Sequence, residues 1–199
     1  MSDTDICNAA LSKLGAEPIL TRADNNNRGR TLNGRYDSVR DAELRRHRWR
    51  FSIARVSLPA LAAAPDSDYA RQFELPGDFL RLIEGGDIKS VPDLCDFRGT
   101  DSSLYSIEGR TILTDLSAPL SIRYIAKIVD DSLFDSAFRE ALASRLAYEC
   151  CKKITGNENE KDGCMADYKN AIREAIRANA LEVAPQDPGD DSWVMVRAR

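Results

Sequence analysis

With 199 residues, 43% hydrophobic and 30% charged, the chain is long enough to bury its own core without disulfides or metals. Its formal net charge of −4 argues against a protein whose whole surface binds nucleic acid, but it leaves room for a local basic patch. The five cysteines form no C-x-x-C pair and there is one histidine, which predicts reduced thiols and no zinc site. We find no signal pattern and no apolar run of about 18 residues, so we expect a soluble protein without membrane contact, made inside the cell.

Two helices are predicted in the first third of the chain. The first can be capped by Asp3 or Thr4 and stopped by Gly15, with apolar residues at spacings of three and four between them. The second covers about residues 28–47, or 28–49, after a polar loop. An Ala-rich run with a proline at each side, residues 58–64, predicts a connection.

The apolar period changes to two from about residue 69, which predicts short strands. Glu108-Gly109-Arg110 separates two such runs and predicts a hairpin with glycine at its centre. Residues 120–128 show the clearest alternation. We therefore expect a small antiparallel β subdomain over residues 66–129.

The sequence Leu75-Pro76-Gly77-Asp78 predicts a turn inside this subdomain. Pro76 fixes its own φ, Gly77 can take the left-handed position of a type II turn, and Asp78 can bind nearby backbone. We expect these three residues to be structural anchors.

Helix returns at Asp131 or Asp135 and is broken at Thr155-Gly156-Asn157, where a second helix follows to about Leu181. So short a link predicts an antiparallel hairpin of two long helices. The predicted fold class is α+β: an antiparallel long-helix bundle with a small antiparallel β subdomain inserted between its N- and C-terminal helices. The expected divisions are an N-terminal helical part (1–64), a β insert (65–129), a helical hairpin in one body with the first part (130–184) and a tail (185–199).

The tail is rich in proline and acids until its end, so we expect it to be flexible in isolation. Its last residues are apolar and then basic, and a solvated tail has little reason to expose them. Two interpretations stay open: the tail folds back on its own core, or it docks into a partner and orders there. The candidate contact residues are Trp193, Val194, Met195, Val196, Arg197 and Arg199.

A basic and aromatic segment, residues 36–51, stands out in the first half of the chain. Residues 35–55 hold seven arginines against three acids. The arginines could pair within or between subunits, contact DNA phosphates, or simply be solvated. The aromatic residues Tyr36, Trp49 and Phe51 are expected to anchor the helical body to the β insert. The arginine candidates for a subunit interface or a DNA channel are Arg40, Arg45, Arg46, Arg48 and Arg50.

No signature of catalysis is present, since the chain has no nucleotide-binding, zinc-protease or nucleophile-elbow pattern. The single histidine, His47, lies among arginines that disfavour its protonation, so we expect a structural role. Cys150 and Cys151 fall on an apolar helix face, where thiols behave as small hydrophobes. We predict no enzyme activity and no cofactor.

Several segments, in the same order along the chain, resemble the tail tubular protein A family, the head-to-tail adaptor of short-tailed bacteriophages. The resembling residues are Ile6-Cys7-Asn8-Ala9-Ala10-Leu11 with Leu14-Gly15; Tyr36 with Arg40, Leu44 and His47; Trp49-Arg50-Phe51; Leu75-Pro76-Gly77-Asp78 with Leu80-Arg81; and Trp193 near a basic C-terminus.

This resemblance implies a structural virion protein that forms a homo-oligomeric ring, usually twelve-fold, in the neck of the virion after assembly in the host cytoplasm. Such a ring docks under the portal protein and carries the tail nozzle protein, and double-stranded DNA passes through it without sequence recognition. A C-terminal extension reaches the portal, which makes Trp193 and its neighbours the portal-contact candidates. Two alternatives remain: a DNA-binding module that uses the arginines of residues 45–50, and a peptidoglycan hydrolase.

Overall fold

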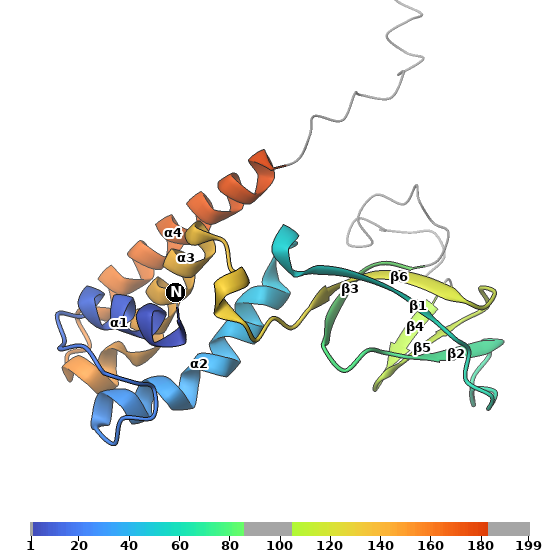
Figure 1. The fold of residues 1–199 in the computed structure, drawn as a ribbon, viewed down its shortest axis with the longest axis horizontal. Coiled ribbons are helices and arrows are strands. Elements are labelled where there is room, and N and C mark those ends of the chain that lie inside the picture. Colours follow the sequence, from blue (N-terminus) through green and yellow to red (C-terminus); the bar gives the residue numbers. More distant parts are fainter. Residues whose placement is uncertain (1, 86–104, 183–199) are drawn as a thin grey trace, which may run out of the picture.

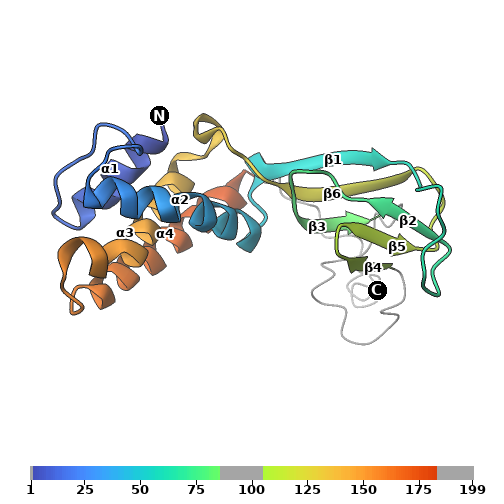
Figure 2. The same cartoon turned by 90° about the horizontal axis from the view of Figure 1, so that it is seen from below.

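The computed structural model describes residues 2–85 and 105–182, and these residues form a mixed α+β fold. Within these ranges, four α-helices lie at one end of the molecule and two antiparallel three-stranded sheets lie at the other (Figures 1 and 2). The predicted α+β class is confirmed. The helices are α1 (Asp3–Lys13), α2 (Asn27–Arg46), α3 (Ser136–Thr155) and α4 (Lys161–Leu181).

Short polar residues start α1, α2 and α3, and a glycine stops α3. Asn26 caps α2 by accepting a 2.7 Å hydrogen bond from Gly29 N, and Asp135 caps α3 by accepting one of 2.8 Å from Ala137 N. Gly156 ends α3 in the left-handed conformation with φ of 69°. The predicted cap of α1 was wrong, because Ser2 occupies the N-cap and its backbone N–H binds the Asp5 carboxylate at 2.7 Å.

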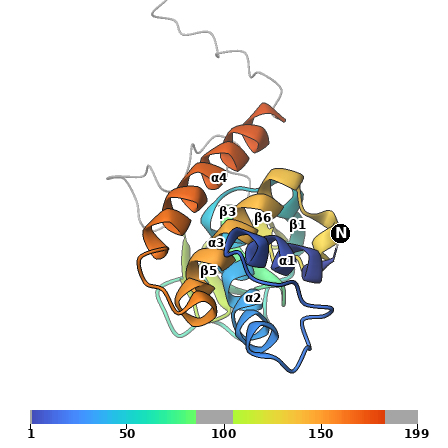
Figure 3. The ribbon, with the colours of Figure 1, turned by 90° about the vertical axis from the view of Figure 1, so that its left-hand side faces the viewer.

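All four helices contribute to one hydrophobic core. Helix α3 packs against the other three, and the end-on view places it among them (Figure 3). Its four-residue apolar period, predicted from the sequence, is the buried face: Leu142, Leu146 and Cys150 are all fully buried. The largest other members of this core are Ile6, Leu11, Leu32, Tyr36, Leu44, Trp49, Phe134, Phe138 and Tyr168.

The strands form a second, smaller core around Phe73, Ile112, Ile122 and Tyr124. One sheet has the order β1-β6-β3 and the other β2-β5-β4, with every pairing antiparallel. The predicted hairpin is confirmed, since Gly109 joins β4 to β5 with φ of 57°. The strands are β1 (Ile53–Leu58), β2 (Arg71–Glu74), β3 (Phe79–Gly85), β4 (Tyr105–Glu108), β5 (Thr111–Thr114) and β6 (Leu120–Ala126).

Strand β1 was not predicted, because its residues were assigned to the N-terminal helical part (1–64). It pairs along its whole length with β6, from Ile53 opposite Ile125 to Leu58 opposite Leu120. Five of its six residues face solvent or are half-buried, as is usual for a strand at the edge of a sheet. The Ala-rich run that follows is a connection, except for a single bridge between Ala60 and Phe73.

The turn between β2 and β3 forms one residue later than predicted. Its closing hydrogen bond runs from Phe79 N to Pro76 O at 3.1 Å, so Gly77 is the first of the two central residues. Gly77 is not among the glycines with positive φ in the described part of the chain. The left-handed, type II assignment of Gly77 was therefore wrong, because a first central position takes a negative φ in the common turn types.

Candidate functional site

Two chain crossings join the helices to the sheets, and the basic segment predicted from the sequence forms the first of them. This crossing leaves α2 at His47, passes through a 3-10 turn (Arg50–Ser52) and enters β1. The second crossing, residues 127–135, leaves β6 and contains another 3-10 turn (Asp131–Leu133) before α3. We take the surroundings of the two crossings as the candidate site.

Trp49 fixes the first crossing to the end of α2. Its side chain is 1% exposed, and its indole N–H donates a 2.8 Å hydrogen bond to Glu43 O. This carbonyl is one of the last four of the helix, which lack partners inside it. The bond therefore satisfies a helix end and holds the departing chain at the same time.

An aromatic cluster of Trp49, Phe51, Phe134 and Phe138 lies where the two crossings meet. The centroid of Phe51 is 6.1 Å from that of Trp49 and 5.7 Å from that of Phe134, and Trp49 and Phe138 meet edge to face at 4.9 Å. Trp49 and Phe51 come from the first crossing, Phe134 from the second and Phe138 from α3. The cluster therefore holds both crossings against the helical core.

Arg40 is not a surface residue. Its side chain is 3% exposed, and its guanidinium binds Asp37 at 3.2 Å and Asp41 at 3.0 Å. It also lies 6.0 Å from the centroid of the buried Tyr36 ring, on which Arg22 stacks at 4.3 Å. This burial removes Arg40 from the candidates for subunit or DNA contact. Asp41 also binds Lys127 at 2.8 Å, so these charges tie α2 to the second crossing.

Asp131, in the second crossing, is buried beside the Tyr36 hydroxyl, with only 8% of its surface exposed. Burial raises its pKa, the Asp3 carboxylate raises it further, and Tyr36, Arg40 and Arg22 oppose the rise. A carboxyl whose pKa is higher in the folded chain than in the unfolded one stabilises the fold at acid pH. That contribution is lost as the pH rises through the folded value.

Replacing Asp131 by asparagine changes the free energy of unfolding, and we expect this change to be more favourable at neutral pH than in acid. The free energy of unfolding, measured by urea denaturation across this range, checks the sign. The exposed neighbour Asp130 is the control, since hydrogen bonds from Ser132 lower its pKa and Asp130→Asn should show the opposite trend. An effect of Asp131→Asn that is the same at every pH would contradict this account.

Arg46 is exposed on one side, but its guanidinium is engaged within the subunit. It donates a 2.6 Å hydrogen bond to the Tyr168 hydroxyl, which in turn donates to the buried Glu43 carboxylate at 2.8 Å. Burial and the Glu43 charge raise the pKa of Tyr168 to about 12, so the phenol keeps its proton. Arg145 approaches the same carboxylate at 3.7 Å, which completes a polar network between α2, α3 and α4.

The remaining arginines surround the first crossing. Arg45, exposed, donates to Leu80 O on β3 and so links α2 directly to a sheet. Asn179 of α4 clamps the backbone of this crossing, since its side chain donates to Arg48 O at 3.0 Å and accepts from Arg50 N at 2.9 Å. Nothing in the sequence marked Asn179 or Tyr168 as part of this site. Tyr168 lies 122 residues from Arg46, and Asn179 lies 131 residues from Arg48, along the chain.

His47 lies edge to face against Trp49, with ring centroids 5.6 Å apart. Burial lowers its pKa, and the charges of Arg46 and Arg81 add to this effect, as the sequence predicted for a histidine among arginines. Cys150 and Cys151 are fully buried on the core face of α3, also as predicted.

The anchors of the β2–β3 turn lie near the second crossing. Asp78 accepts a 3.0 Å hydrogen bond from the Tyr124 hydroxyl, and its carbonyl accepts one of 2.7 Å from Lys127 N. Arg110 donates to Pro76 O at 2.7 Å.

The portal-contact candidates Trp193, Val194, Met195, Val196, Arg197 and Arg199 lie outside the described residues.

The site offers aromatic packing, buried ion pairs and exposed guanidinium groups. Within residues 2–85 and 105–182, no group of three His, Cys, Asp or Glu side chains is placed to hold a metal ion. None of the helices in these ranges is long and apolar enough to cross a membrane. No known protein-family model matches the chain, and no curated protein matches it.

Proposed function

We propose that this chain is the subunit of a ring-shaped head-to-tail adaptor of a short-tailed bacteriophage. The observation that carries the proposal is where the family-like residues lie. Segments that are far apart in sequence contribute to one helical core, in which Ile6, Leu11, Tyr36, Leu44 and Trp49 are all buried. The apolar residues of the first three resembling segments therefore share one core, as a common fold requires.

The architecture suits a structural role. In the proposal the four helices form the ring body as an antiparallel long-helix bundle, and the sheets form an insert that projects from it (Figure 2). The two ends of the molecule have separate cores, which are joined by two chain crossings and by contacts of α2 with β3 and β6. One end can therefore form the ring while the other meets a different partner, such as the tail nozzle protein.

The arginines support pairing between subunits more than sequence-independent binding of free DNA. Arg40 and Arg46 already bind acids or phenols of their own subunit. The net charge of −4 also disfavours duplex binding by the isolated chain. In the proposal, Arg45, Arg48 and Arg50 serve subunit pairing beside a channel through which DNA passes without being read. The ring belongs to the neck of the virion and assembles in the host cytoplasm.

The C-terminal residues are proposed to dock on the portal protein of the same phage. Deleting residues 185–199 should abolish co-sedimentation of the adaptor with purified portal rings, because the apolar and basic end would be lost. Trp193→Ala alone should weaken binding by at least about 2 kcal/mol, as is usual for a buried aromatic anchor. Circular dichroism serves as the folding control. Unchanged co-sedimentation of the deletion variant would refute docking by the tail, while leaving the ring itself standing.

A further inference from the structure

We propose that an acidic surface on the second crossing of one subunit binds the basic segment on the first crossing of the next subunit. The acidic surface is residues 129–135 and the basic segment is residues 45–50. This inference rests on the proposed ring and names the contact that closes it. The partner is a second copy of the chain, and each copy presents both surfaces.

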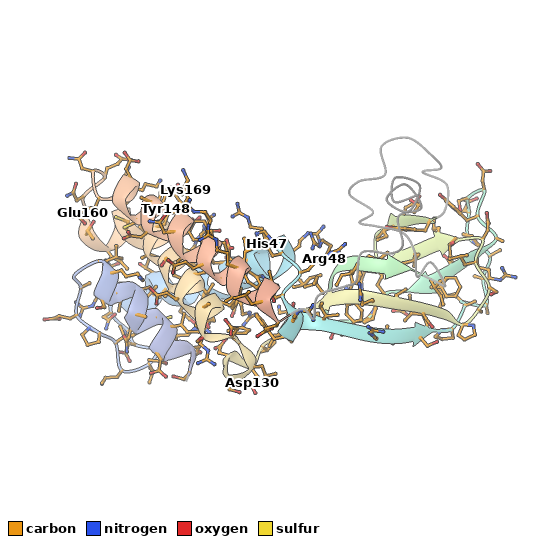
Figure 4. The ribbon with its side chains drawn as sticks, turned by 90° about the horizontal axis from the view of Figure 1, so that it is seen from above. His47, Arg48, Asp130, Tyr148, Glu160 and Lys169 are labelled. Carbon is orange, nitrogen blue, oxygen red and sulfur yellow. The ribbon has the colours of Figure 1, made fainter. Side chains whose placement is uncertain are left out.

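The two surfaces lie at the same position along the long axis of the molecule, because they flank one aromatic cluster at the junction of helices and sheets (Figure 4). Trp49, in the basic segment, is 6.1 Å from Phe51, which is 5.7 Å from Phe134 in the acidic surface, measured between ring centroids. Subunits side by side in a ring meet at equal heights, so a contact between these two surfaces requires no displacement along the ring axis.

The surfaces also face in opposite directions. Seen from above, His47 and Arg48 lie along one side of the junction and Asp130 lies along the other (Figure 4). They are therefore separated by the core of their own subunit and cannot neutralise each other within it. An interface that joins two different surfaces of identical chains is heterologous, and repetition of such a contact builds a ring when the rotation closes.

The charges are complementary. The basic segment has four arginines and no acid among six residues. The acidic surface has no base among seven residues, and of its three aspartates Asp130 is exposed, Asp135 is half-buried and Asp131 is buried. Arg45 and Arg50 are exposed, and so is Asp130. Hydrogen bonds from Ser132 lower the pKa of Asp130, which keeps its negative charge. Guanidinium groups are well suited to such pairs, and like charges at these positions would be strongly unfavourable.

The acidic surface carries apolar side chains that its own subunit leaves uncovered. Val129 is 67% exposed and Leu133 is 57% exposed, only four residues apart and on either side of the 3-10 turn. An apolar centre with a charged rim is the usual composition of a specific interface. The aliphatic stems of long arginine side chains can cover such residues while their charged ends reach the acids.

Charge reversal tests this contact. Self-association of the full chain is measured by sedimentation velocity, alone and with portal rings. Arg48→Glu and Asp130→Arg should each weaken association at least about tenfold, because each places like charges opposite one another. The chain carrying both reversals should associate again, and an equimolar mixture of the two single variants should also associate. Lys169→Glu, on α4 away from the junction, is the control for a mere change of net charge and should associate normally.

The outcomes separate this contact from the ring itself. Rescue by the double variant and by the mixture supports it, since a folding defect would not be repaired by a second reversal. If the wild type associates and the single variants associate equally well, the ring stands and this interface is wrong. If the wild type associates under neither condition, both the interface and the proposed function are wrong.

Discussion

Replacing Trp49 by alanine is expected to lower the free energy of unfolding by about 3–5 kcal/mol. The substitution removes the centre of the aromatic cluster, where the indole meets Phe138 and Phe51, and leaves a cavity in the core. It also removes the hydrogen bond to Glu43 O that holds the end of α2. Urea denaturation followed by circular dichroism at 222 nm, a standard helix signal, measures the loss.

Two further variants separate packing from hydrogen bonding. Trp49→Phe keeps an aromatic ring but cannot donate to Glu43 O, so it should cost about 1–3 kcal/mol. Leu20→Ala alters a side chain that is 89% exposed and should change stability by no more than about 0.5 kcal/mol. A Trp49→Ala variant as stable as the Leu20→Ala variant would contradict the anchoring role of Trp49.

Replacing Arg40 by alanine is expected to destabilise the protein by about 3 kcal/mol, at the lower end for a broken buried pair. Asp37 and Asp41 would lose their guanidinium partner, and the Tyr36 ring would lose one of its two covering arginines. The effect stays at the lower end because Asp37 is largely exposed and Asp41 keeps its ion pair with Lys127. The same denaturation measurement gives the value.

Arg55→Ala is the matched control, since Arg55 is an exposed arginine on β1 and should cost no more than about 0.5 kcal/mol. Arg40→Met retains an apolar stem over Tyr36 and should fall between the two. Equal stabilities of Arg40→Ala and Arg55→Ala would mean that Arg40 acts at the surface, and would return it to the contact candidates.

The regular elements could be predicted because their signals are local. The four-residue period of α3, the helix stop at Gly156 and the hairpin at Gly109 each depend on neighbours in sequence. Strand β1 was missed because its partner, β6, lies more than sixty residues away, and six residues of which only Leu58 is buried give a weak pattern on their own. The shifted turn at Gly77 shows the same limit, since a one-residue offset depends on the strands on each side.

The basic segment could be located from sequence, but the role of each arginine could not. Arg40 and Arg46 look alike in a charge count. Arg40 has Asp37 and Asp41 on its own helix and lies buried, whereas Arg46 faces outward and meets Tyr168 from the other end of the chain. The burial of Arg40 beside Tyr36 and the hydrogen bond from Arg46 to Tyr168 of α4 decide this difference, and both depend on the tertiary structure.

The mass of the purified full chain, alone and mixed with portal protein of the same phage, tests the central claim most directly. The account predicts a discrete, ring-sized oligomer of this chain bound to the portal. The mass that this oligomer adds to the portal should be a whole multiple of the 22.1 kDa subunit. A chain that stays monomeric under both conditions, and that does not co-sediment with the portal, would contradict it.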